Sequence, residues 1–99
     1  MSEHPLKVYE RLDPALLKLV KENGDFAFSG NALPKKFKYL MVMAIDAVHG
    51  APQGVKANAV AAMQAGATKE EIMETLRILQ YVSGAGVVYV TAHALENVF

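Results

Sequence analysis

Proline and glycine residues divide this 99-residue chain into segments of helix length. Proline is favoured in the first turn of a helix, and glycine is favoured just after the last turn. The residues that open segments in this way are Pro14, Pro34 and Pro52, and those that close them are Gly24, Gly50 and Gly66. Because the intervening runs carry apolar residues at helical spacing, the chain is predicted to be all-α.

The limits of the predicted helices follow from these residues and from the capping signals. They are residues 5–11, 14–22, 34–48, 52–65, 68–82 and 87–97. Asp13 is the expected N-cap of the second helix, and Thr68 with Glu71 predicts a capping box at the start of the fifth. Residues 87–91 have high β propensity, but a lone strand would have no partner, so we predict helix there as well.

Two segments are unusually rich in apolar residues. Residues 25–32 are predicted to form a loop in which Phe26 and Phe28 pack onto an apolar surface. Residues 39–45 are apolar on all sides of the predicted helix, which indicates burial on every side. This stretch is far too short to cross a membrane, because a spanning helix needs about 20 apolar residues.

The composition predicts self-association. Hydrophobic residues make up 53% of the chain, and no cysteine is present to form a disulfide or to bind a metal. A domain of this size buries only about 60–65% of its surface on folding, so part of the apolar surface is expected in a subunit interface. The 10 basic and 10 acidic residues cancel, which argues against nucleic acid and membrane partners. No signal peptide is visible, so a soluble, cytoplasmic protein is expected.

Four stretches of the sequence together resemble the carboxymuconolactone decarboxylase and alkylhydroperoxidase-D-like superfamily. They are ALPKKFKYL at 32–40, HGA at 49–51, AGATKEEI at 65–72 and VSGAG at 82–86. The resemblance covers about residues 33–95 of a single predicted domain, residues 1–99, in which residues 1–24 form N-terminal helices. It implies an all-helical subunit that is an obligate homo-oligomer, either a trimer or a hexameric ring.

The chain departs from the redox members of this superfamily at the positions that carry their chemistry. Those members have a glutamate, a CxxC pair and a histidine. The resemblance places the glutamate at Tyr39, the pair at Ala51 and Gly54, and the histidine at Asn58, and none of these residue types is present. Because peroxidatic and disulfide mechanisms need a thiolate, thiol peroxidase activity is excluded, and no cofactor is expected.

Asp46 and His49 are the polar pair best suited to acid–base chemistry. They lie three residues apart near the end of a predicted helix, so both side chains point to one side. In a functional interpretation His49 is the general base or acid, Asp46 orients it, and Asn58 donates a hydrogen bond to a substrate oxygen. In a structural interpretation Asp46 pairs with a lysine of another subunit, and His49 caps the helix C-terminus.

The remaining positions of the predicted pocket are small or carry groups that pair with carboxylates. Ala51 and Gly54 leave room at the floor of the pocket, and Tyr39 or Lys56 pairs with the carboxylate of a small organic acid. No spacing of histidines indicates a metal site. The sequence therefore predicts a metal-free site for a small organic acid.

Two functions remain open at this point. The first is a cofactor-free acid–base decarboxylase or isomerase of a small organic acid, favoured by the Asp46–His49 pair. The second is a non-catalytic oligomeric scaffold or small-molecule-binding protein that kept the fold, favoured by the loss of all four superfamily residues. His93, with Tyr89 four residues before it, is either a ligand pair or an ordinary packed couple.

Overall fold

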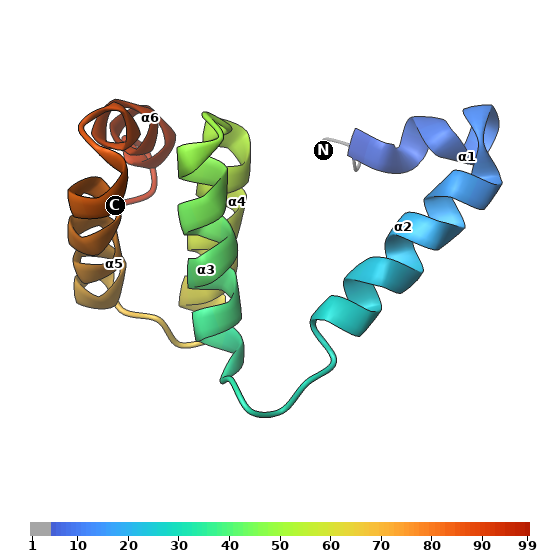
Figure 1. The fold of residues 1–99 in the computed structure, drawn as a ribbon, viewed down its shortest axis with the longest axis horizontal. Helices are drawn as coiled ribbons and strands as arrows, with labels where there is room; N and C mark the ends of the chain where they lie inside the picture. The colour runs from blue at the N-terminus through green and yellow to red at the C-terminus, as the bar shows by residue number, and fades with distance from the viewer. Residues whose placement is uncertain (1–4) are drawn as a thin grey trace. The chain divides into compact units, whose positions relative to one another are not determined.

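The computed structural model describes residues 5–99, and these residues form helices and turns with no strand. The helices fall into two compact units, which divide between Ala32 and Leu33 (Figure 1). The all-α prediction is confirmed, including helix rather than strand at residues 87–91.

The first unit consists of one 3-10 turn and two α-helices. They are η1 (Pro5–Val8), α1 (Tyr9–Leu12) and α2 (Pro14–Ala27). The chain turns at Asp13, which caps α2 as predicted, because its Oδ1 accepts a hydrogen bond from the Leu16 amide at 3.0 Å. Among the described residues of this unit, Leu17 is the only one that is buried.

Helix α2 continues beyond the predicted end at residue 22 and reaches Ala27. Gly24 does not end the helix, because it lacks the positive φ of a helix-terminating glycine and its carbonyl accepts a hydrogen bond from the Phe28 amide at 3.1 Å. A glycine inside a helix costs only about 1 kcal/mol, which neighbouring residues can offset. The prediction of a loop over residues 25–32 is therefore wrong for residues 25–27, which are helical, and is confirmed for residues 28–32. Within its own unit Phe26 is 78% exposed, so it does not pack onto an apolar surface there.

The second unit is a four-helix assembly. Its helices are α3 (Lys35–Val48), α4 (Pro52–Gln64), α5 (Lys69–Ser83) and α6 (Gly86–Leu95). Helices α3 and α4 run antiparallel side by side, and α6 packs across the end of the assembly (Figure 1). Met43, Val55 and Ile72 are the largest fully buried side chains at its centre.

Small residues set how closely α4 approaches its neighbours. Ala59 and Ala62 on α4 are fully buried. Ala47 on α3 and Ala94 on α6 are no more than 5% exposed. The one buried polar side chain among the described residues is Thr91 on α6, and its hydroxyl donates to the Val87 carbonyl at 2.8 Å. Burial of this hydroxyl is therefore compensated within its own helix.

The turns on either side of α4 follow the predicted chemistry. Gly50 and Gly66 have φ of 70° and 103°, in the left-handed region that favours glycine. The capping box is confirmed: Thr68 Oγ1 accepts from the Glu71 amide at 3.1 Å, and Glu71 Oε1 accepts from the Thr68 amide at 2.9 Å. These contacts fix the start of α5.

The prediction that residues 39–45 are buried on every side is wrong for this chain. Leu40 and Met43 are buried, but Met41 and Ile45 are each 53% exposed. Helix α3 contacts α4, α5 and α6 on part of its circumference only, and the rest of its apolar surface has no cover from the described residues of this unit. None of the helices in the described part of the chain is long and apolar enough to cross a membrane.

Candidate functional site

The candidate site lies where the second half of α3 faces the first half of α4. Asn58 on α4 reaches across to α3, and its Nδ2 donates to Asp46 Oδ2 at 3.2 Å. The same Nδ2 also donates to the backbone carbonyl of Gly54, one helical turn earlier, at 2.9 Å. An amide nitrogen carries two hydrogens, so both are used within the chain.

Gly54 allows the two helices to approach closely at this point. A Cβ atom placed on Gly54 would overlap the carboxylate of Asp46, whose Cγ would lie 2.7 Å away. Only glycine therefore fits beside Asp46 without movement of the backbone or the carboxylate. The room that the sequence predicted at Gly54 is filled by the Asp46 side chain.

The turn between the helices contributes a further contact. The Ala51 amide donates to the backbone carbonyl of Asp46 at 2.9 Å, and Ala51 is the N-cap residue of α4. Asp46, Ala51, Gly54 and Asn58 thus form one half-buried group, here called the α3–α4 cluster. Four of the seven residues predicted for the site are brought together in it.

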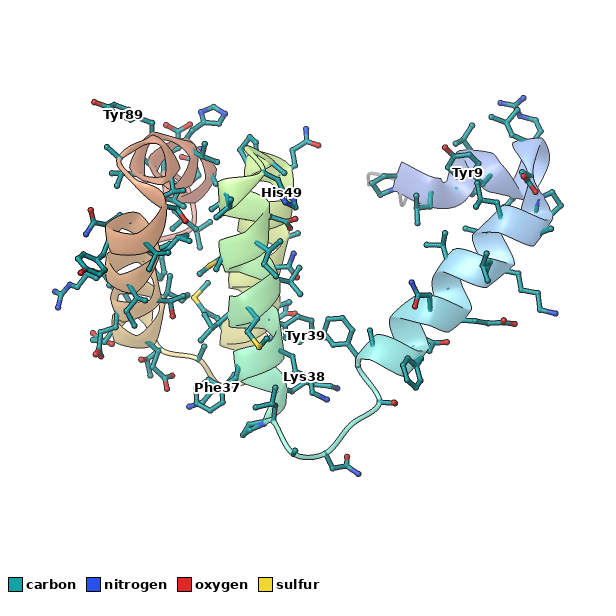
Figure 2. The ribbon with its side chains drawn as sticks, in the orientation of Figure 1. Tyr9, Phe37, Lys38, Tyr39, His49 and Tyr89 are labelled. Carbon is teal, nitrogen blue, oxygen red and sulfur yellow. The ribbon has the colours of Figure 1, made fainter. Side chains whose placement is uncertain are left out.

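His49 lies beside this cluster but does not join its hydrogen bonds. It is the C-cap residue of α3, and its backbone amide donates to the Ile45 carbonyl at 3.0 Å. Its side chain is exposed at the end of the helix (Figure 2). Within the described residues, Asp46 is hydrogen-bonded to Asn58 and not to His49.

Tyr39 and Lys56 lie outside the α3–α4 cluster. Tyr39 is two turns before Asp46 on α3, where it is half-buried against the core of the second unit. Lys56 is exposed, because two residues along a helix correspond to a rotation of about 200°, which turns it away from both Gly54 and Asn58. The fold of the single chain therefore does not bring Tyr39 or Lys56 to the α3–α4 cluster, where the sequence predicts that one of them pairs with a substrate carboxylate.

Tyr89 and His93, the pair on α6, and the metal-binding residue types are the remaining candidates from the sequence. Tyr89 is 78% exposed on α6 (Figure 2). His93, on the same helix, is also exposed. Among the described residues, no group of three or more metal-binding side chains is close enough to hold an ion.

Sequence reasoning missed two neighbouring apolar grooves between α3 and α5. One groove, of about 370 Å³, is lined by Phe37, Leu40, Met41, Ala44, Glu71, Glu74 and Thr75. The other, of about 320 Å³, is lined by Ala44, Thr75, Ile78, Leu79, Val82 and Ser83. The signal in the sequence is Phe37, Met41 and Ile45, which are apolar residues at i, i+4 and i+8 on α3. The sequence prediction instead treats this stretch as part of a helix that is buried on every side.

An ion pair joins α3 to α5 at one end of these grooves. Lys36 Nζ lies 2.8 Å from Glu71 Oε2, and both side chains are about 30% exposed. The hydrogen bond from Lys36 lowers the pKa of Glu71 below its ordinary value, and the hydrogen bond from the Thr68 backbone lowers this pKa further. The pair therefore stays ionised and ties the first turn of α3 to the capping box of α5.

The model of the carboxymuconolactone decarboxylase family matches residues 14–97. The chain belongs to this family. The match begins in α2 and runs through α6, so it extends beyond the predicted range of 33–95 at both ends. Searches of curated proteins and of solved structures gave no significant match. This member of the carboxymuconolactone decarboxylase family has no CxxC motif and no cysteine, so it has no thiolate of its own.

Proposed function

We propose that this carboxymuconolactone decarboxylase family protein works without thiol peroxidase chemistry, as a non-catalytic oligomeric helical scaffold. The observation that carries the proposal is the use of both Asn58 amide hydrogens inside the α3–α4 cluster, on Asp46 and on the Gly54 carbonyl. The donor predicted for a substrate oxygen is thus already occupied.

The packing of the cluster supports the same function. The resemblance to redox members places their CxxC pair at Ala51 and Gly54, and here the space beside Gly54 holds the Asp46 carboxylate. A substrate at this position would have to displace a hydrogen-bonded carboxylate from the interface of two helices. Breaking such a half-buried bond leaves polar groups without partners, at a cost of about 1–3 kcal/mol.

The scaffold we propose is a homo-oligomer, either a trimer or a hexameric ring. Eighteen large hydrophobic residues of the described chain are exposed by 39% or more, among them Tyr81, Val82 and Ile78 at 68–85%. Clusters of exposed apolar side chains in a soluble protein mark surfaces that another molecule covers.

A second candidate is a cofactor-free acid–base enzyme, or a binding protein, for a small organic acid. It is favoured by the exposed imidazole of His49 at the end of α3, three residues from Asp46. Within the described residues, Asp46 Oδ1 accepts no hydrogen bond, so this oxygen is open to an imidazole that turns toward it. The pair would then exchange a proton with a bound acid.

Native mass spectrometry of the freshly purified chain, together with an assay of CO2 release from carboxymuconolactone, tests the proposal. We expect an oligomer with no retained organic acid, and no CO2 release above the buffer rate. The variants are His49→Ala and, as the control, Lys56→Ala, which removes another exposed side chain, on the side of α4 away from Gly54 and Asn58.

CO2 release by the wild-type chain and by Lys56→Ala, lost in His49→Ala with unchanged helicity by circular dichroism, would overturn the scaffold proposal and establish the acid–base enzyme. A retained organic acid without turnover would instead establish the binding protein.

A further inference from the structure

The starts of α3 and α5 meet at a single carboxylate, that of Glu71. Its Oε1 accepts a hydrogen bond from the Thr68 amide at 2.9 Å, within the capping box of α5. Its Oε2 accepts a hydrogen bond from Lys36 Nζ at 2.8 Å, in the first turn of α3. We propose that the Glu71 carboxylate is a shared joint of the two helix starts, and that protonation of this one group opens both starts in a single step.

The start of α3 has no capping group of its own. The N-cap residue is Pro34, no side chain forms a cap hydrogen bond there, and the first turn holds no acidic residue. The same turn carries lysines at residues 35, 36 and 38, and positive charges are unfavourable at the positive end of a helix dipole. The carboxylate of Glu71 compensates one of these charges from α5. The start of α3 therefore depends on a residue 35 positions further along the chain.

The start of α5 depends on the same side chain. The capping box leaves the Thr68 amide with Glu71 Oε1 as its acceptor, while Thr68 Oγ1 accepts from the Glu71 amide at 3.1 Å. A protonated Glu71 keeps a carbonyl oxygen for the Thr68 amide but loses its charge, and a hydrogen bond to a charged group is roughly twice as strong as a neutral one. Protonation therefore weakens the contacts to Thr68 and to Lys36 together.

Lys36 is the charged side chain that acts on Glu71 within the described residues. The other charged groups in the two first turns and beside them are Lys35, Lys38, Lys69, Glu70 and Glu74. The hydrogen bond and the charge of Lys36 lower the pKa of Glu71, and none of those other groups contributes to the shift. The joint is therefore closed above about pH 4.5, the unfolded value, and opens as the pH falls through the lower, folded pKa.

The rest of the second unit is held together by contacts that acid does not titrate. Met43, Val55 and Ile72 are fully buried apolar side chains at its centre, and Ala59 is fully buried in the middle of α4. Local opening at helix ends needs less free energy than opening of such a core. We therefore expect the joint to open while α4 stays closed.

Hydrogen exchange of assigned backbone amides in the full chain, read by NMR from about pH 7 to about pH 3, tests the proposal. The reporters are the Phe37 amide in α3, which donates to the Pro34 carbonyl at 3.1 Å, and the Thr68 amide before α5. The Ala59 amide is the reference for the core. We expect the protection of Phe37 and Thr68 to fall with one common midpoint below about pH 4.5, while Ala59 keeps its protection.

The variant Glu71→Gln imitates the protonated residue at every pH, and Glu70→Gln is the matched control in the same first turn of α5. At neutral pH we expect Glu71→Gln to lower the protection of both reporters, by roughly two- to fivefold at Phe37, and to have no further step in acid. Glu70→Gln should behave as the wild type.

Lys36→Met separates the two contacts of the joint. It should lower the protection of Phe37 at neutral pH and leave Thr68 protected, because Glu71 still accepts from the Thr68 amide. The acid step of Thr68 should move to a higher pH, because the largest cause of the lowered pKa of Glu71 is removed.

Different midpoints at Phe37 and Thr68 in the wild type, or an acid step at Phe37 that persists in Glu71→Gln, would overturn the proposal. Loss of Ala59 protection in the same step would also overturn it, because the whole unit would then be unfolding. If circular dichroism shows that Glu71→Gln has lost helicity at neutral pH, Lys36→Met decides: an unchanged Thr68 midpoint in that variant rejects the shared joint.

Discussion

At the scale of single residues, the contact between Gly54 and Asp46 determines how α3 and α4 fit together. The backbone of Gly54 lies where any side chain would meet the Asp46 carboxylate, and Asn58 holds that carboxylate in place. The contact combines a steric requirement with a hydrogen bond. A change at either residue therefore affects the other.

Gly54→Ala is expected to lower the free energy of unfolding by about 1–3 kcal/mol, because the added methyl group overlaps the carboxylate and forces the helices apart. Urea unfolding measures the change. Part of the loss should return in the double variant Gly54→Ala with Asp46→Ala, since the overlapping group is then absent.

Gly24→Ala is the matched control for this substitution. Gly24 lies within α2, and an added Cβ would have no atom within 4 Å. The same change should raise stability there by about 0.5–1 kcal/mol, through helix propensity alone. Equal effects at both glycines would contradict the steric argument.

At the scale of elements, the helix ends with side-chain caps could be predicted from the sequence. Asp13 and the Thr68–Glu71 capping box mark their helices because the interacting groups are three residues apart. The end of α2 could not be placed, because glycine permits both a helical and a left-handed backbone. At Gly24 the helical conformation prevails.

The ion pair between α3 and α5 predicts how these elements respond to acid. Glu71 has a lowered pKa when the chain is folded, so its stabilising contribution is present above the unfolded pKa of about 4.5 and is lost as the pH falls through the folded value. Lys36→Met removes the largest cause of the lowered pKa. We therefore expect a lower Tm at neutral pH and a smaller fall in Tm below about pH 4.5.

Thermal unfolding followed by circular dichroism from about pH 7 to about pH 3 measures this difference. Lys35→Met is the control, because it removes a neighbouring exposed lysine that has no ion pair in the described structure. If Lys36→Met and Lys35→Met showed the same acid profile, the pair would not be the cause.

At the scale of the whole molecule, the sequence predicted the family and the helical class but not the internal contacts of the candidate site. Asp46 and His49 attracted attention because they are three residues apart, whereas the hydrogen bond forms between Asp46 and Asn58, 12 residues apart and on different helices. A sequence pattern within one helix does not determine how far that helix is shifted along a neighbouring helix. For the same reason, the sequence could not predict which apolar residues of α3 are left exposed.

The homo-oligomeric assembly proposed above predicts a concentration-dependent stability. Because the other copies bind the folded chain only, a tenfold rise in protein concentration should raise the Tm by about 3–5 °C. Differential scanning calorimetry over two decades of concentration measures this. A constant Tm would count against the assembly.

The placement of Asp46 against Gly54 also limits the order in which a dithiol could be introduced into this chain. A CxxC pair requires cysteine at residues 51 and 54, and a cysteine at 54 brings a Cβ into the carboxylate of Asp46. A shorter residue at 46 must come first, and that step removes the group to which Asn58 donates. Each first step is unfavourable by itself, so the carboxylate acts as a barrier against acquiring a dithiol.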